Sequence, residues 1–214
     1  MLREIFCRIL DTIGYKSLQM STRIQTKTIA LTDVGTKEDS FFLEPSQKHD
    51  TLREYGKTYK LQTFIETGTY YGDTVEAVRN IFETCYSIEI GEELADKARV
   101  RFANNPNIHI LNGDSGKVLP ELLRKINKPC LFWLDGHYSG GDTAGWATKV
   151  PILQEVKAIL DHRDDHVILI DDARCFIGGQ SGYPTISYLS NFILKKQPQL
   201  TVEIRDDIIR VHKK

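Results

Sequence analysis

The chain has 214 residues, enough for one full-sized domain with a core of its own. Its formal net charge of −1 offers no basic field for nucleic acid. No apolar run approaches the roughly 20 residues that span a bilayer. We therefore expect an ordinary globular protein, cytoplasmic by default, with no membrane span and no nucleic-acid partner.

The first 48 residues differ in character from the rest of the chain. Residues 1–14 carry apolar side chains at helical spacing with charges on the opposite face, which predicts an amphipathic helix. Charges within its apolar stretch argue against a signal peptide. Because its polar face mixes both signs, we expect it to dock on the domain or on a second subunit of a homodimer. Residues 15–47 are polar and aperiodic, so an irregular arm is expected before a domain of residues 49–214.

From residue 49 onwards, helical and strand-like patterns alternate. A short helix over 49–60, with Asp50 as its cap, is expected first. The predicted strands cover residues 61–66, 85–90, 107–114, 129–135 and 166–172. The predicted helices that follow them cover residues 73–83, 92–102, 117–126, 150–160 and 184–196. Two last segments, 201–205 and 208–214, flank Asp206-Asp207, which predicts a tight hairpin.

This alternation predicts the α/β class. Parallel neighbours need crossover connections, so a strand–helix repeat favours a parallel sheet with helices on both faces. The expected fold is a Rossmann-like doubly wound sheet, mostly parallel, with one antiparallel strand from the C-terminal hairpin. In such sheets, ligands bind outside the carboxyl ends of the strands, near the point where the strand order reverses.

Carboxylates stand at or just after the ends of the first five predicted strands. One acidic strand end usually means a turn or a helix cap, but the whole set on one edge points to a binding site. The residues are Glu66, Glu89, Asp114, Asp135 and the pair Asp171-Asp172.

The glycine spacing after the first strand distinguishes between cofactors. A dinucleotide fold would show GxGxxG with a pyrophosphate on the helix N-terminus. Residues 66–72 read ETGTYYG, an ExGxxxG pattern whose carboxylate would repel a pyrophosphate. A cationic cofactor fits better, as does a ribose whose hydroxyls donate to Glu89.

These motifs resemble those of class I S-adenosylmethionine-dependent methyltransferases over residues 61–214. ETGTYYG resembles the family's glycine loop, IEI at 88–90 its ribose-binding acid, and NGDS at 112–115 its adenine-side strand end. The resemblance implies S-adenosylmethionine as the cofactor. The cofactor-binding residues that it implies are Glu66, Gly68, Thr69, Gly72, Glu89, Asp114, Ser115 and Asp135.

Asp135 and Asp171 end strands that are separated by one helix, so they are expected at equivalent ends of adjacent strands. Strand axes lie about 5 Å apart, and carboxylates at that spacing repel unless a cation joins them or one stays protonated. A hard divalent ion such as Mg²⁺ is the natural occupant. The alternative without a ligand is that Asp171-Asp172 only bonds to the backbone of a turn.

The sequences LDGH (134–137) and LIDDA (169–173) resemble the metal-dependent macrocin and sugar O-methyltransferase group. The resemblance implies Asp135, Asp171 and Asp172 as Mg²⁺ ligands and a hydroxyl acceptor on a small molecule, a sugar or a lipid-linked intermediate. A metal-bound hydroxyl ionises more readily, and His137 is the candidate catalytic base that accepts its proton.

Two other functions fit the same residues. One is a metal-independent small-molecule methyltransferase in which His137 or Asp135 acts directly as the base. The other is a non-catalytic cofactor-binding or scaffold protein with this fold. Methyltransferases that act on amino groups of bases carry an Asn/Asp-Pro-Pro-aromatic run after the fourth strand, whereas residues 135–138 read DGHY.

Overall fold

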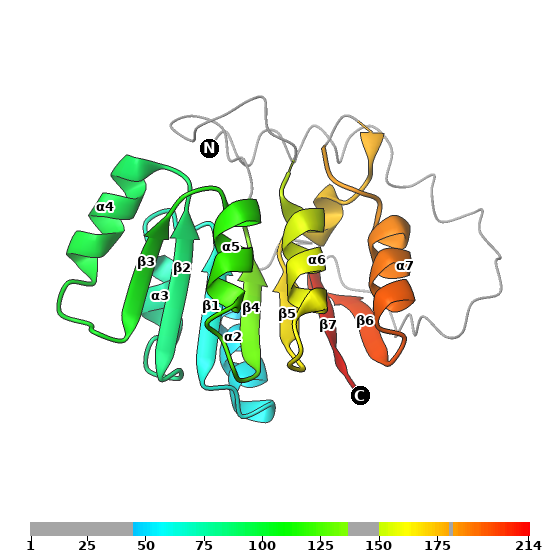
Figure 1. The fold of residues 1–214 in the computed structure, drawn as a ribbon, viewed down its shortest axis with the longest axis horizontal. Helices are drawn as coiled ribbons and strands as arrows, with labels where there is room; N and C mark the ends of the chain where they lie inside the picture. The colour runs from blue at the N-terminus through cyan, green and yellow to red at the C-terminus, as the bar shows by residue number, and fades with distance from the viewer. Residues whose placement is uncertain (1–44, 137–149, 180–181) are drawn as a thin grey trace.

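The computed structural model describes residues 45–136, 150–179 and 182–214, drawn in Figure 1. Its strands are β1 (Thr63–Thr67), β2 (Thr84–Glu89), β3 (Ile108–Asn112), β4 (Cys130–Leu134), β5 (Val167–Ile170), β6 (Leu200–Arg205) and β7 (Ile208–Lys213). Its helices are α2 (Pro45–Thr58), α3 (Asp73–Val78), α4 (Glu92–Arg101), α5 (Ser115–Leu123), α6 (Ile152–Asp161), α7 (Ile186–Lys196) and the short 3₁₀ turn η2 (Ala173–Cys175).

The strands form one sheet in the order β3-β2-β1-β4-β5-β7-β6. Strands β1 to β5 run parallel, and β7 lies antiparallel between β5 and β6. Asp206 and Asp207 connect β6 to β7 with positive φ values of 55° and 59°, the backbone that a tight hairpin requires. The predicted doubly wound, mostly parallel sheet with a C-terminal hairpin is confirmed.

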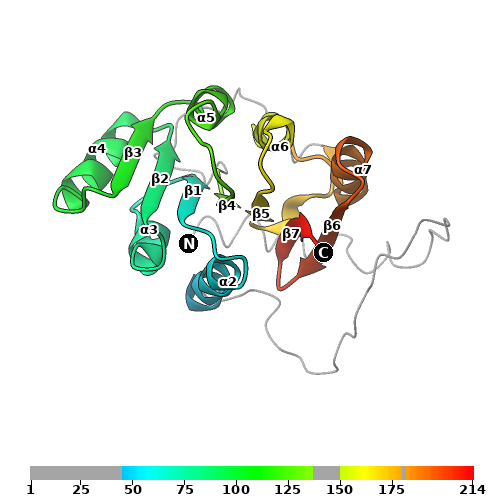
Figure 2. The same ribbon diagram turned by 60° about the horizontal axis from the view of Figure 1, so that its bottom comes forward.

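Helices cover both faces of the sheet (Figure 2). Helices α5, α6 and α7 pack on one face over a core that includes Ile65, Phe132 and Ile168. Helices α2 and α3 pack on the other, over a core that includes Phe64 and Trp133, and α4 packs on β2 and β3. Strand residues alternate between the two cores because successive side chains point to opposite faces. Within the described ranges, no helix is long and apolar enough to cross a membrane.

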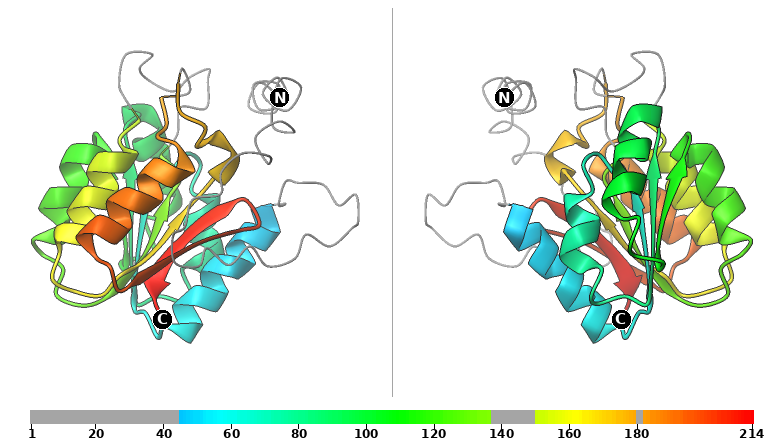
Figure 3. Two further views of the ribbon diagram at one scale, coloured as in Figure 1. Left: turned by 90° about the vertical axis from the view of Figure 1, so that its right-hand side faces the viewer. Right: turned by 90° about the vertical axis from the view of Figure 1, so that its left-hand side faces the viewer.

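Helix α2 lies against the β6–β7 hairpin (Figure 3). The Tyr55 hydroxyl donates to Glu203 Oε1 at 3.1 Å, and the Tyr55 ring lies 5.9 Å from that of His212. The guanidinium of the fully buried Arg210 lies 5.6 Å from the centre of the Tyr55 ring. These contacts fix α2, the helix that precedes β1, to the C-terminal hairpin.

The two largest errors in the predicted helix boundaries are the start of α2 and the end of α3. Helix α2 begins at Pro45, a residue that favours the first turn, so Asp50 lies inside the helix and pairs with Arg53 instead of capping. Helix α3 ends at Val78 because the chain tightens there. The Ile81 N–H donates to the Val78 carbonyl at 2.8 Å and turns Phe82 into the core. The helix predicted at 1–14, and with it the dimer contact, lies outside the described residues.

Candidate functional site

The acidic strand ends gather at one edge of the sheet because β1, β2, β3, β4 and β5 are parallel and adjacent. The strand order reverses between β1 and β4, where Thr67 pairs with Leu134. The Asp135 N–H continues the ladder by donating to the Thr67 carbonyl at 3.0 Å. The glycine loop and Asp135 therefore stand side by side at the point where ligands bind in this class of sheet.

Two glycines allow the loop after β1 to turn there. Gly68 and Gly72 have φ values of 91° and 82°, which L side chains rarely adopt. A Cβ on Gly68 would lie 2.4 Å from the Asp135 carbonyl oxygen, and one on Gly72 would lie 2.7 Å from the Phe102 ring. Only glycine permits β1 and β4 to approach this closely at the rim.

Glu66 is the buried acid of the loop, with 1% of its surface exposed. Ser87 donates its hydroxyl to Glu66 Oε2 at 2.6 Å, and Thr69 Oγ1 lies 2.6 Å from the same Ser87 hydroxyl. Burial is the main cause that raises the pKa of Glu66 to about 8, with the nearby Asp135 carboxylate adding to it. Thr69 and Glu66 are thus joined through Ser87 beneath the loop.

Replacing Glu66 by glutamine should change how stability depends on pH. The folded-state pKa of about 8 lies above the ordinary value of 4.5, so the unfolded chain gives up this proton first. The stability that Glu66 contributes is fully present below pH 4.5 and is lost as the pH rises toward 8, at up to about 1.4 kcal/mol per pH unit. We expect Glu66→Gln to remove that decline.

Urea unfolding of the wild type and Glu66→Gln at a series of pH values measures the difference. Glu54→Gln, which changes an exposed glutamate of α2, is the matched control and should keep the wild-type slope. Parallel curves for the wild type and Glu66→Gln from pH 5 to 8 would contradict the assignment of a neutral buried acid.

Glu89 ends β2 with its carboxylate held by two backbone groups. The Tyr70 N–H donates to Oε2 and the Gly91 N–H donates to Oε1, each at 2.8 Å. Each carboxylate oxygen keeps a further lone pair for an outside donor. The side chain is therefore fixed in place next to the glycine loop and can still accept from ligand hydroxyls.

Asp114 and Ser115 follow β3 at the start of α5. Asp114 is the N-cap, accepting from the Gly116 N–H at 2.9 Å through Oδ1. Ser115 is the first residue of the helix. Capping accounts for Asp114 without a ligand, and Ser115 stands next to it at the rim.

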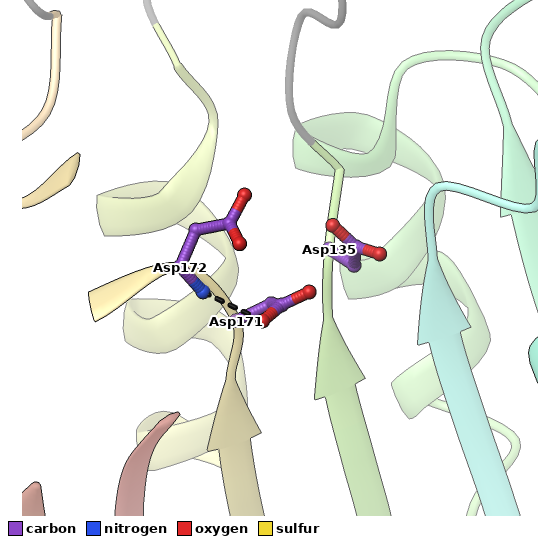
Figure 4. A group of neighbouring side chains, drawn as sticks. All are labelled: Asp135, Asp171 and Asp172. Atoms are coloured by element: carbon purple, nitrogen blue, oxygen red, sulfur yellow. Dashed lines mark hydrogen bonds between the residues drawn. The ribbon is translucent and has the colours of Figure 1, made fainter. Parts of the chain in front are cut away.

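Three carboxylates converge at the ends of β4 and β5 (Figure 4). Leu134 pairs with Ile170, so the next residues, Asp135 and Asp171, are neighbours on adjacent strands. One oxygen from each of Asp135, Asp171 and Asp172 lies within 4.8 Å of the others. We call these three residues the carboxylate cluster. The juxtaposition expected from the sequence is present.

Burial makes it costly in free energy to keep all members of the carboxylate cluster ionised. Asp171 is 1% exposed and Asp172 5%. Burial, and then the carboxylates of Asp135 and Asp172, raise the pKa of Asp171 to about 7, although Lys48 acts in the opposite direction. A buried group of like charges is stable only with protons or cations beside it.

Lys48 reaches the carboxylate cluster from the first turn of α2, which the sequence analysis did not foresee. Its Nζ lies 2.5 Å and 2.8 Å from the two oxygens of Asp171 and 3.3 Å from Asp172 Oδ1. A sequence signal existed, since the buried residues Leu52 and Tyr55 follow Lys48 by four and seven residues and so share one helix face with it. A lysine on an inward face is a candidate site residue.

Asp172 is held by residues that sequence reasoning also missed. It adopts φ 54°, and its N–H donates to Asp171 Oδ1 at 2.7 Å. Arg174 Nη1 lies 2.9 Å from Asp172 Oδ1 and also pairs with the carboxylate of Asp207 in the hairpin turn. The Arg174 and Ala173 backbone N–H groups donate to Asp207 as well. The C-terminal hairpin thus fixes the loop that carries Asp172.

The predicted site residues fall into two groups on this rim. Glu66, Gly68, Thr69, Gly72 and Glu89 surround the loop after β1, and the carboxylate cluster stands beside it across β4. Asp114 and Ser115 lie further along, beyond β2. His137, the predicted base, lies outside the described residues.

The fold is similar to solved methyltransferases. An O-methyltransferase of Bacillus cereus in complex with SAH has a TM-score of 0.56 and 15% identity, covering 82% of this chain and 84% of that one. TomG of Streptomyces achromogenes, an O-methyltransferase of tomaymycin synthesis solved with SAM, has a TM-score of 0.55 and 14% identity, covering 80% and 81%.

The similarity is not confined to O-methyltransferases. The 23S rRNA methyltransferase ErmE has a TM-score of 0.51 and 16% identity, covering 81% of this chain and 70% of that one. No family model and no curated protein matches the chain. At these identities the likeness establishes the methyltransferase fold.

Proposed function

We propose that the protein is an S-adenosylmethionine-dependent methyltransferase that acts on a hydroxyl of a small molecule, a sugar or a lipid-linked intermediate with the help of Mg²⁺. The observation that carries this proposal is the carboxylate cluster, which lies beside a glycine loop at the switch point of a methyltransferase fold. The net charge of −1 supports a small acceptor over nucleic acid.

The methyl donor is assigned to the loop after β1 and the ends of β2 and β3. Glu66, Gly68, Thr69 and Gly72 would border its methionine part, and Asp135 faces the same loop. Glu89 would accept from the ribose hydroxyls, since Tyr70 and Gly91 already orient its carboxylate. Asp114 and Ser115 would lie near the adenine.

The metal is assigned to Asp135, Asp171 and Asp172. The donor set fits a hard divalent cation, because it consists of carboxylate oxygens from three residues that can meet around one ion. When bound, Mg²⁺ would lower the pKa of the acceptor hydroxyl and orient it. The chain itself would keep Asp171 shielded from water and hold Asp172 through Arg174.

One observation favours a second candidate, a methyltransferase that works without a metal. Lys48 already supplies a positive charge to Asp171 and Asp172. In that case Asp135 or His137 would take the acceptor proton directly. The two candidates share the donor site and differ in their response to chelation.

Replacing Glu89 by glutamine tests the donor assignment. The wild type should bind S-adenosylhomocysteine, and Glu89→Gln should bind it about 10- to 100-fold more weakly, because hydrogen bonds to a charged acceptor contribute about 1.5–3 kcal/mol. Isothermal titration calorimetry of the two proteins measures this ratio.

The matched control is Glu93→Gln, which changes an exposed glutamate in the first turn of α4. It should leave the affinity at the wild-type value. Equal binding by Glu89→Gln and the wild type would contradict the assignment of Glu89 to the ribose hydroxyls. No binding by any of the three proteins would contradict the proposed function.

A further inference from the structure

Lys48 is the half-buried anchor of the first turn of α2. The three residues before it, Pro45, Ser46 and Gln47, are exposed, whereas 16% of the Lys48 side chain is accessible. Its ammonium bridges both oxygens of Asp171 and one of Asp172. The lysine thus engages two of the three carboxylates that are proposed to hold the metal.

A divalent ion at the carboxylate cluster would need the oxygens that Lys48 now engages. An ammonium is a compact charge that takes the place of a small cation, and two cations cannot share one set of oxygens without strong repulsion. Arg174 Nη1 reaches the same Asp172 Oδ1 atom as Lys48 and is also paired with Asp207. The competition with Lys48 is therefore centred on the two oxygens of Asp171, both of which its ammonium engages.

We propose that Lys48 is an internal competitor for the divalent ion, so that metal binding expels its ammonium from Asp171 and frees the first turn of α2. The inference rests on the metal site of the proposed function. The rest of α2 stays in place, because Leu52 and Tyr55 are buried and Arg53 Nε donates to the Ala77 carbonyl at 3.1 Å. Metal affinity is then set by a residue that is not itself a ligand.

Titration of Mn²⁺ into the full chain, followed by electron paramagnetic resonance of the free ion, tests the competition. Lys48→Met keeps an unbranched side chain that is one atom shorter and removes the charge, so it should tighten Mn²⁺ binding by at least about tenfold. Lys57→Met, which changes an exposed lysine in the last turn of the same helix, should leave the affinity unchanged. Adding Asp171→Asn to Lys48→Met should remove the binding.

Hydrogen exchange of the unmodified protein supplies a second readout, which does not depend on how the variant folds. The amides of residues 49–51 donate to carbonyls of the first turn in an α-helix. Saturating Mn²⁺ should speed their exchange several-fold. The amides of residues 55–58, further along α2, should exchange at the same rate with and without Mn²⁺.

The outcomes separate the two proposals. Equal Mn²⁺ affinity in the wild type and Lys48→Met, with no change in exchange at 49–51, would overturn the competition and leave the metal site standing. Mn²⁺ binding that survives Asp171→Asn, or no binding by any variant, would overturn both. Weaker Mn²⁺ binding by the wild type than by Lys48→Met, together with faster exchange at 49–51 in the wild type, is the expected result.

Discussion

Replacing Asp171 by asparagine is expected to lower methyl transfer by on the order of a thousandfold and to abolish divalent-ion binding. The side chain keeps its shape, so the Asp172 N–H can still donate to the Oδ1 atom at this position. The substitution removes the charge of the most buried member of the carboxylate cluster. Cofactor affinity should stay at the wild-type value because Glu66 and Glu89 are untouched.

Turnover with a panel of hydroxyl acceptors and calorimetry with S-adenosylhomocysteine measure the two effects separately. Asp165→Asn is the matched control, since Asp165 is exposed and precedes the opposite end of β5. EDTA should reproduce the loss in the wild type, and Mg²⁺ should restore activity. Turnover that is insensitive to the chelator would favour the metal-independent candidate instead.

Replacing Gly68 by alanine is expected to be the most damaging single change in the glycine loop. The new Cβ would stand 2.4 Å from the Asp135 carbonyl oxygen, a backbone atom at the end of a central strand. Since neither β1 nor β4 can move freely inside the sheet, the free energy of unfolding should fall by at least about 3 kcal/mol. Cofactor binding should be lost along with it.

Gly179→Ala separates the clash from the backbone strain. Gly179 has a positive φ of 66°, but a Cβ there would meet nothing within 4 Å. We expect it to cost about 1–2 kcal/mol, the penalty of the left-handed conformation alone. Thermal unfolding of both variants gives the comparison. A Gly68→Ala variant as stable as Gly179→Ala would show that the rim is less tightly packed than the structure describes.

The fold could be predicted because each element carries its own local signal. The strands β4 and β5 are buried throughout and consist of apolar residues, so they read as continuous apolar runs, which is typical of parallel sheets. Aspartates at Asp206-Asp207 marked the hairpin. Helix ends were less predictable, because the start of α2 at Pro45 and the tight turn after Val78 depend on local hydrogen bonding that the apolar spacing does not encode.

The carboxylate cluster could be predicted because the strand register brings residues after β4 and β5 together without any side-chain choice. Its cationic partners could not be predicted in the same way. Lys48 lies in the helix that precedes β1, far in sequence from the cluster. Asp207 reaches Arg174 only through the placement of β7 beside β5. Such contacts depend on tertiary packing, which a single sequence reveals only through hints such as a lysine on an apolar face.

We propose that one rim of the sheet holds both a methyl donor and a divalent ion. Diffraction from crystals soaked with S-adenosylhomocysteine and Mn²⁺, measured for anomalous scattering, tests it most directly. We predict a manganese peak within ligand distance of Asp135, Asp171 and Asp172, the ribose on Glu89, and Lys48 displaced from Asp171. A manganese peak elsewhere, or a nucleoside that does not contact the glycine loop, would contradict the account.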